Sequence, residues 1–188
     1  MPVHDLRPMS TPYATLERSG EDWQLRFVRT LAHAPARVWR ALGDPDGMRG
    51  WFPARMEGVR AAGAQLRFVF DEAPEHDSVG QMIAYEPPHL LELTWEEDRL
   101  RAELRDNGDG GCELIFSATF PDVGKAARDA AGWHVCLDNL ERNVDGRTPS
   151  RSDDQPWPEL MRKYSELFPP EASTVGPPDW HPEARAAD

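Results

Sequence analysis

The chain has 188 residues, which is the length of one ordinary domain with flanking segments, so two separate domains are not expected. Its 33 acidic and 21 basic side chains give a formal net charge of −12, which disfavours nucleic acids and anionic membranes as partners because both carry negative charge. No run approaches the roughly 20 apolar residues that span a bilayer, and the first residues lack the pattern of a secretion signal, so we expect a cytoplasmic protein.

The first elements are expected after a poorly ordered segment, residues 1–20, which is rich in proline and shows no sustained periodicity. Alternating apolar and polar side chains then predict a strand over residues 23–31. Two segments that begin with a proline predict short helices over residues 34–43 and 44–50. Together these two helices should form a helical hairpin.

Six further strands are expected, each bounded by turn residues. They cover residues 54–59, 64–70, 79–85, 90–96, 99–105 and 112–120. The short links between them make neighbouring strands antiparallel. Alternation predicts one face for burial, formed by Leu66, Phe68, Phe70, Leu91, Leu93, Trp95, Leu114, Phe116 and Ala118.

A long helix is expected over residues 123–144, where the apolar period changes to about 3.6 residues. Its apolar stripe consists of Ala126, Ala130, Trp133, Leu137, Leu140 and Val144. It is the only predicted element that can cover the apolar face of the sheet. Beyond it, residues 147–156 are polar, residues 157–168 predict a short amphipathic helix, and the proline-rich residues 169–188 predict disorder.

Three motifs carry a resemblance to a known family. They are Ala-Pro-Ala-Arg-Val-Trp-Arg-Ala-Leu at residues 34–42, Asp44-Pro45 leading to Trp51-Phe52, and Gly132-Trp133-His134 with Leu137. In this order they resemble the START-like superfamily, also called SRPBCC proteins or the birch-pollen-allergen fold. More narrowly, the chain resembles the AHSA-type branch, which is related to the activator of the heat-shock-protein ATPase.

The resemblance implies an α+β helix-grip fold over residues 21–146, with residues 147–188 as a C-terminal extension. In that fold an antiparallel sheet of about seven strands wraps round the long C-terminal helix, and two short helices lie between strands one and two. A cavity is expected between sheet and helix. The superfamily includes lipid carriers, hormone receptors, polyketide cyclases and cochaperones, so the fold does not fix the activity.

Ten large apolar side chains should converge in that cavity and are our candidate ligand-binding residues. They are Trp51, Phe52, Phe68, Phe70, Met82, Leu93, Trp95, Phe116, Trp133 and Leu137. Ligand pockets are concave and mostly apolar, which this set fits. A closed aromatic core would show the same sequence pattern, so the sequence leaves open whether the cavity is empty or filled.

His134 and Asp138 are the candidate catalytic residues, because a base and an acid four residues apart share one side of a helix. The alternative is a partly exposed histidine that is hydrogen-bonded to Asp138 on the helix surface. His76 lies in an acidic loop, where solvated charge is more common than a metal site. We expect no metal and no cofactor, since the sequence contains no phosphate-binding, dinucleotide-binding or zinc-protease motif.

Three functions remain open at this stage. The first is binding of a small hydrophobic ligand, such as a lipid, without a specific reaction. The second is a cyclase or dehydratase that acts on a hydrophobic substrate, with His134 and Asp138 as acid and base. The third is a cochaperone-like interaction module, in which the acidic surface and residues 157–168 contact a protein partner. A homodimer is neither favoured nor disfavoured.

Overall fold

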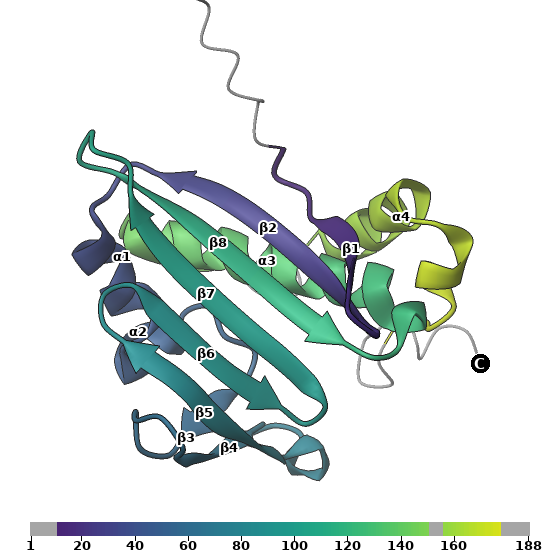
Figure 1. The fold of residues 1–188 in the computed structure, drawn as a ribbon, viewed down its shortest axis with the longest axis horizontal. Helices are drawn as coiled ribbons and strands as arrows, with labels where there is room; N and C mark the ends of the chain where they lie inside the picture. The colour runs from purple at the N-terminus through teal and green to yellow at the C-terminus, as the bar shows by residue number, and fades with distance from the viewer. Residues whose placement is uncertain (1–10, 151–155, 178–188) are drawn as a thin grey trace, which may run out of the picture.

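One antiparallel sheet forms most of the protein. The computed structural model describes residues 11–150 and 156–177. The strands are β1 (Thr15–Ser19), β2 (Asp22–Leu31), β3 (Arg55–Glu57), β4 (Gln65–Val69), β5 (Ser78–Glu86), β6 (Leu90–Trp95), β7 (Asp98–Asp106) and β8 (Cys112–Phe120). Their order is β1-β2-β8-β7-β6-β5-β4-β3, so the last strand returns to lie beside β2 (Figure 1).

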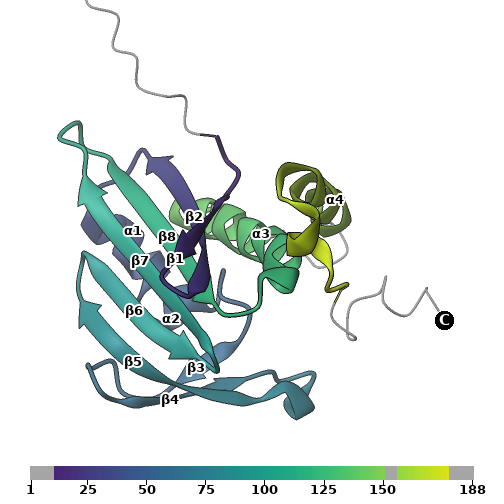
Figure 2. The same cartoon turned by 45° about the vertical axis from the view of Figure 1, so that its right-hand side comes forward.

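Helices cover one side of this sheet. They are α1 (Pro35–Leu42), α2 (Pro45–Met48), α3 (Ala126–Val144) and α4 (Trp157–Leu167), with short 3-10 turns η1 (Pro74–His76), η2 (Val123–Lys125) and η4 (Pro170–Ser173). The long helix α3 crosses behind the sheet in Figure 1, and Figure 2 shows α4 on the side of α3 that faces away from the sheet. The expected α+β helix-grip fold is confirmed.

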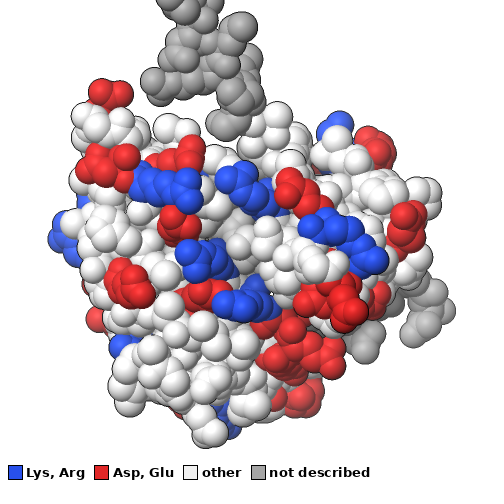
Figure 3. Space-filling model, viewed as in Figure 1, with Lys and Arg blue, Asp and Glu red and all other residues white. Residues whose placement is uncertain are grey.

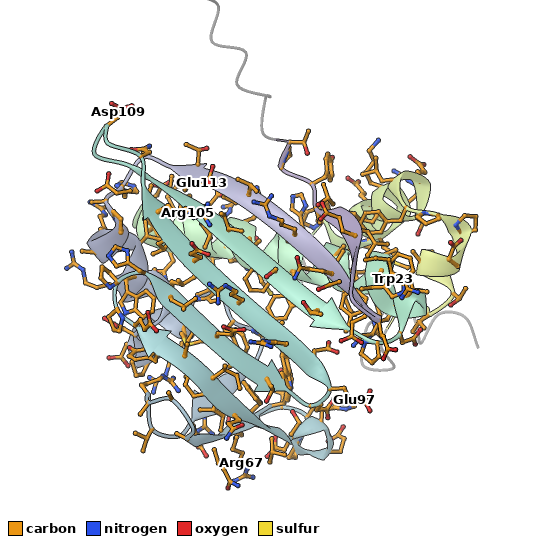
Figure 4. All side chains as sticks on the ribbon, in the orientation of Figure 1. Trp23, Arg67, Glu97, Arg105, Asp109 and Glu113 are labelled. Carbon is orange, nitrogen blue, oxygen red and sulfur yellow. The ribbon has the colours of Figure 1, made fainter. Side chains whose placement is uncertain are left out.

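The two faces of the sheet differ in polarity, as the alternation predicts. The register places Phe116 of β8 opposite Phe27 of β2 and opposite Ala102 of β7. All three side chains therefore share one face of the sheet, the concave face, which the helices cover. On the outer face, Glu92 accepts hydrogen bonds from Arg99 and Arg101. Figure 3 shows acidic and basic side chains interspersed over this outer face, and Figure 4 shows Arg105 and Glu113 projecting from it.

Helix α3 is buried on more than one side. All six residues of its predicted apolar stripe are buried. Ala127, Ala131, His134 and Val135 lie off that stripe and are buried as well. Helix α4 accounts for part of this second buried face, because it packs against α3 through an apolar side of its own that includes Tyr164. The helix expected over residues 157–168 is therefore present and belongs to the folded domain.

The termini contain more structure than the sequence indicated. Residues 15–19 were expected to be poorly ordered, but they form β1 as an antiparallel hairpin with β2, through a turn where Gly20 adopts a φ of 66°. Strand β1 was missed because it is an edge strand with almost no buried face, so it lacks the alternation that marks other strands. The sheet therefore has eight strands instead of about seven.

The C-terminal segment differs from expectation in the same way. Turn η4 lies in the part expected to be disordered, and the backbone N–H groups of Thr174 and Val175 both donate to the carbonyl of Gly124. Residues 1–10 and 178–188 lie outside the described residues. The division into a domain of residues 21–146 with two flanking segments stays a prediction.

Candidate functional site

Seven aromatic side chains gather beneath the concave face, and we call them the aromatic cluster: Trp51, Phe52, Phe68, Phe70, Trp95, Phe116 and Trp133. Their rings are close neighbours. The ring centroids of Phe116 and Trp133 lie 4.9 Å apart, and those of Phe68 and Trp95 lie 5.0 Å apart. Phe52 joins the two pairs, since its ring lies 5.4 Å from Trp95 and 5.8 Å from Trp133. Sequence positions more than 80 residues apart thus meet at one place.

The concave face is packed with side chains in this structure. The other three candidate residues, Met82, Leu93 and Leu137, are buried beside the cluster. Among the surface pockets in the described part of the chain are two of about 530 and 410 Å³. The larger one lies against the outer side of α3 and the other at one end of β6 and β7, and none of the ten candidate residues lines either of them. An open cavity at the cluster therefore stays a prediction.

Trp51 has a buried indole N–H that lacks a hydrogen-bond acceptor among the described residues. Its side chain follows α2 and lies edge-on against the rings of Phe52 and Phe116, at 5.4 and 6.4 Å. The residue is only 4% exposed, and its indole Nε1 is buried without a hydrogen-bond partner among the described residues. By contrast, the indole N–H of Trp95 donates to Ser78 Oγ at 2.7 Å. Buried donors nearly always have an acceptor, so the Trp51 N–H calls for an explanation.

The cluster reaches the surface at Phe70 and Trp95, which are only partly buried. These two rings are stacked with centroids 6.1 Å apart. The adjoining β4–β5 loop is held by Asp77, which accepts from the backbone N–H of Phe70 at 2.9 Å and from Arg67 at 2.8 Å. Arg67 itself points away from this edge of the sheet (Figure 4). At this end, members of the cluster are therefore exposed to solvent.

His76 lies beside the same end, in turn η1. Its ring centroid is 6.4 Å from that of Phe70, and its Nε2 is 3.9 Å from a carboxylate oxygen of Glu75. Within residues 11–150 and 156–177, no three histidine, cysteine or acidic side chains gather as a metal site would require.

His134 is buried, and the expectation of a partly exposed surface histidine was wrong. It is 5% exposed, and its Nδ1 is hydrogen-bonded to the hydroxyl of Tyr164 at 2.8 Å. Its Nε2 lies 3.7 Å from the carboxylate of Asp138. Burial lowers the pKa of His134 to about 4, with the positive charge of Arg29 acting in the same direction and Asp138 opposing it. The ring is therefore neutral at pH 7.

Two members of this network were missed at the sequence level, namely Arg29 and Tyr164. Arg29 extends from β2 to α3, where it pairs with Asp138 at 3.1 Å and Glu141 at 3.5 Å. Burial raises the pKa of Glu141, and Arg29 opposes that shift. Both residues come from segments far from His134 in sequence, so no local spacing indicates them. The network is separated from the aromatic cluster by the ring of Phe27.

A comparison with family models gives one match. The model described as Activator of Hsp90 ATPase homolog 1-like protein matches residues 32–145. A comparison with curated proteins found no match. Within the part of the chain that the structure describes, no helix is both long and apolar enough to cross a membrane.

Several solved structures have the same fold. A conserved protein of unknown function from Enterococcus faecalis is 22% identical, with a TM-score of 0.68 over 82% of this chain and 89% of that protein. CalU16 from Micromonospora echinospora is 18% identical, with a TM-score of 0.64 over 82% of this chain and 94% of that protein. DynU16, described as a putative protein in the dynemicin biosynthetic locus, is 21% identical, with a TM-score of 0.60 over 68% of this chain and 49% of DynU16.

Proposed function

The chain belongs to the family of Activator of Hsp90 ATPase homolog 1-like proteins, and from this premise we propose that it binds a small hydrophobic molecule within the aromatic cluster. The observation that carries the proposal is the indole N–H of Trp51, a buried donor without an acceptor among the described residues. A ligand oxygen or nitrogen that accepts from this N–H would remove the cost of leaving it unpaired. The surrounding rings would supply apolar contact area.

Binding at this place requires side chains to move, because the cluster is packed in the structure. Three methionines, Met48, Met56 and Met82, are buried in the same core. Methionine is unbranched and has three rotatable bonds, so it changes shape at lower cost than a branched or aromatic side chain. The rings of Phe70 and Trp95 are only half-buried. These two rings and the three methionines form a part of the interior that can rearrange around a bound ligand.

The similar structures offer an analogy for the class of ligand. The description of DynU16 places that protein in a biosynthetic locus for dynemicin. For the present chain this supports a small organic molecule as the ligand, by analogy of fold alone. We therefore propose a small, largely apolar compound and no specific reaction.

Titration with a neutral fluorescent probe, N-phenyl-naphthylamine, tests the proposal. We expect saturable binding that is weakened by Phe52→Ala, because that ring contacts four other members of the cluster. Trp51→Phe keeps an aromatic ring but removes the donor together with part of the ring system, so it should weaken hydrogen-bonding ligands more than it weakens the probe. Trp23→Phe is the control, because Trp23 stacks under Arg18 and has no ring contact with the cluster in the described structure. An absence of saturable binding by the wild-type protein would overturn the proposal.

The two alternative functions have less support. An enzyme would need the His134 imidazole at its substrate, yet its two nitrogens face Tyr164 and Asp138, and Phe27 separates it from the cluster. An interaction module would need the apolar side of α4, which is already buried against α3. The unpaired nitrogens of the His134 network, on Arg29, lie beside the carboxylates of Asp138 and Glu141, so they do not call for a ligand as the Trp51 indole N–H does.

A further inference from the structure

Arg60 is a partly buried cation without a carboxylate partner. It lies between β3 and β4, and its Nη2 donates to the carbonyl of Met56 at 3.3 Å and lies 3.8 Å from the sulfur of Met48. Its Nε and Nη1 atoms are buried and have no hydrogen-bond partner among the described residues. No acidic side chain in the described structure forms an ion pair with it. In a chain with 33 acidic side chains, this is an unusual position for an arginine.

The neighbours of Arg60 place it beneath the concave face. Met48 and Met56 both belong to the buried core. Tyr85, which pairs with Leu91 across β5 and β6, is the one ionisable group whose charge opposes the lowering of the Arg60 pKa by burial. Its contact with the sulfur of Met48 in α2 places the guanidinium next to the helical hairpin.

Trp39 adds a second unpaired donor at the same end. Its ring lies 5.4 Å from that of Tyr85, and the residue is 4% exposed. Its indole Nε1 is buried without an acceptor among the described residues. Two side chains at the helical hairpin, Trp39 of α1 and Arg60 against Met48 of α2, thus carry buried N–H donors that no acceptor in the described structure meets.

We infer that this end of the concave face receives a carboxylate, so that the bound molecule is a hydrophobic carboxylic acid whose anionic group lies between Arg60 and Trp39. This inference rests on the proposed function and adds the chemical class of the ligand. A carboxylate accepts several hydrogen bonds at once and neutralises a guanidinium that is partly removed from water. A neutral polar group would satisfy the donors but would leave the buried charge unpaired.

The sheet register gives the dimension of the ligand. Tyr85 and Trp95 lie at opposite ends of the β5–β6 pair, because Trp95 is aligned with Gly80 and Tyr85 with Leu91. Five residues of β5 separate these positions, which is about 16 Å at the usual strand rise of roughly 3.3 Å per residue. Met82 and Leu93 lie between the two ends. An elongated apolar tail would follow this line from Arg60 toward the aromatic cluster.

The test compares one acid with its neutral ester. Dansylaminoundecanoic acid and its methyl ester are titrated into the full chain, and binding is followed by dansyl fluorescence. We expect the wild-type protein to bind the acid about tenfold more tightly than the ester, which is the effect expected of one buried charged hydrogen bond. Arg60→Met should abolish this preference by weakening the acid alone. Arg49→Met is the matched control, because it removes an equal charge from an exposed arginine at the end of α2, in the helical hairpin next to Arg60.

Each result bears on one of the two proposals. If the wild-type protein binds acid and ester equally, the carboxylate inference is wrong and the proposed function stands. If it binds neither, the proposed function fails with it. Arg60→Lys covers the case in which Arg60→Met does not fold, since lysine keeps the charge and should keep a preference for the acid. If the Arg49→Met control also loses the preference for the acid over the ester, the inference is wrong, because the preference would then come from the charge of the protein surface and not from Arg60.

Discussion

The hydroxyl of Tyr164 is hydrogen-bonded to Nδ1 of His134 at 2.8 Å and at the same time accepts from the backbone N–H of Ala14 at 3.0 Å. One side-chain oxygen thereby joins α4, α3 and the segment that leads into β1. The other ring nitrogen, Nε2, faces the carboxylate of Asp138 at 3.7 Å. The C-terminal extension is thus fixed to the helix grip by a fully buried hydrogen-bonded group.

Tyr164→Phe should destabilise the protein. The substitution keeps the ring but leaves the buried Nδ1 of His134 and the N–H of Ala14 without partners, which costs about 1–3 kcal/mol in free energy of unfolding. Urea unfolding measures this change. Tyr13→Phe is the matched control, because Tyr13 packs against the same two rings while its hydroxyl makes no hydrogen bond in the described structure. Equal effects of the two substitutions would contradict the role assigned to Tyr164.

The stability of the protein should fall as the pH falls from 6.5 to about 4 because of His134. Its pKa is lower in the folded state, so the unfolded chain binds a proton in this range that the folded protein does not bind. The free energy of unfolding therefore decreases with decreasing pH across this window. Arg29 and Asp138 face the ring from β2 and α3, and Tyr13 and Tyr164 pack against it.

The variant His134→Gln isolates this contribution. Glutamine retains an acceptor for Tyr164 and does not titrate, so its unfolding free energy should depend less steeply on pH between 6.5 and about 4. Burial also raises the pKa values of Asp98 and Glu141, and the wild type and the variant both retain these two groups. Parallel pH profiles for wild type and variant would show that His134 does not carry the effect.

Lys125→Met should lower stability at neutral pH. Lys125 Nζ donates to both carboxylate oxygens of Asp98, at 2.6 and 2.7 Å. Lys125 immediately precedes α3 and Asp98 is the first residue of β7, so this ion pair connects the start of the helix to the start of the strand. Burial already raises the pKa of Asp98, and removal of the lysine leaves this carboxylate without its partner. We expect a loss of about 1–2 kcal/mol by thermal or urea unfolding. Lys163→Met, on the exposed side of α4, should change stability by less than about 0.5 kcal/mol.

Two glycine substitutions should have opposite effects on stability. A methyl group at Gly132 in α3 meets nothing within 4 Å, so Gly132→Ala should stabilise the protein by about 0.5–1 kcal/mol through helix propensity. A methyl group at Gly80 would lie 2.0 Å from the carbonyl oxygen of Thr94, so Gly80→Ala must push β5 from β6 and should cost about 1–3 kcal/mol. A destabilising Gly132→Ala would show that the open space beside α3 is occupied.

The elements of the helix grip were predictable because each has a local signature. The stripe from Ala126 to Val144 repeats at helical spacing, and the alternation around Phe68 and Leu93 marks half-buried strands. Proline at the starts of α1 and α2 indicated the hairpin. Strand β1 lacked such a signature, since an edge strand with exposed side chains does not alternate.

The amino-acid sequence by itself determined which side chains are apolar and at what period, and therefore the fold class and the ten residues that gather beneath the sheet. Only the tertiary structure decided that these rings touch, that Tyr164 meets His134, and that Arg60 and the indole groups of Trp39 and Trp51 are buried without acceptors. The physical reason is that hydrophobic periodicity is a local property of the chain. Hydrogen bonding and charge pairing of buried groups depend instead on which distant segments meet.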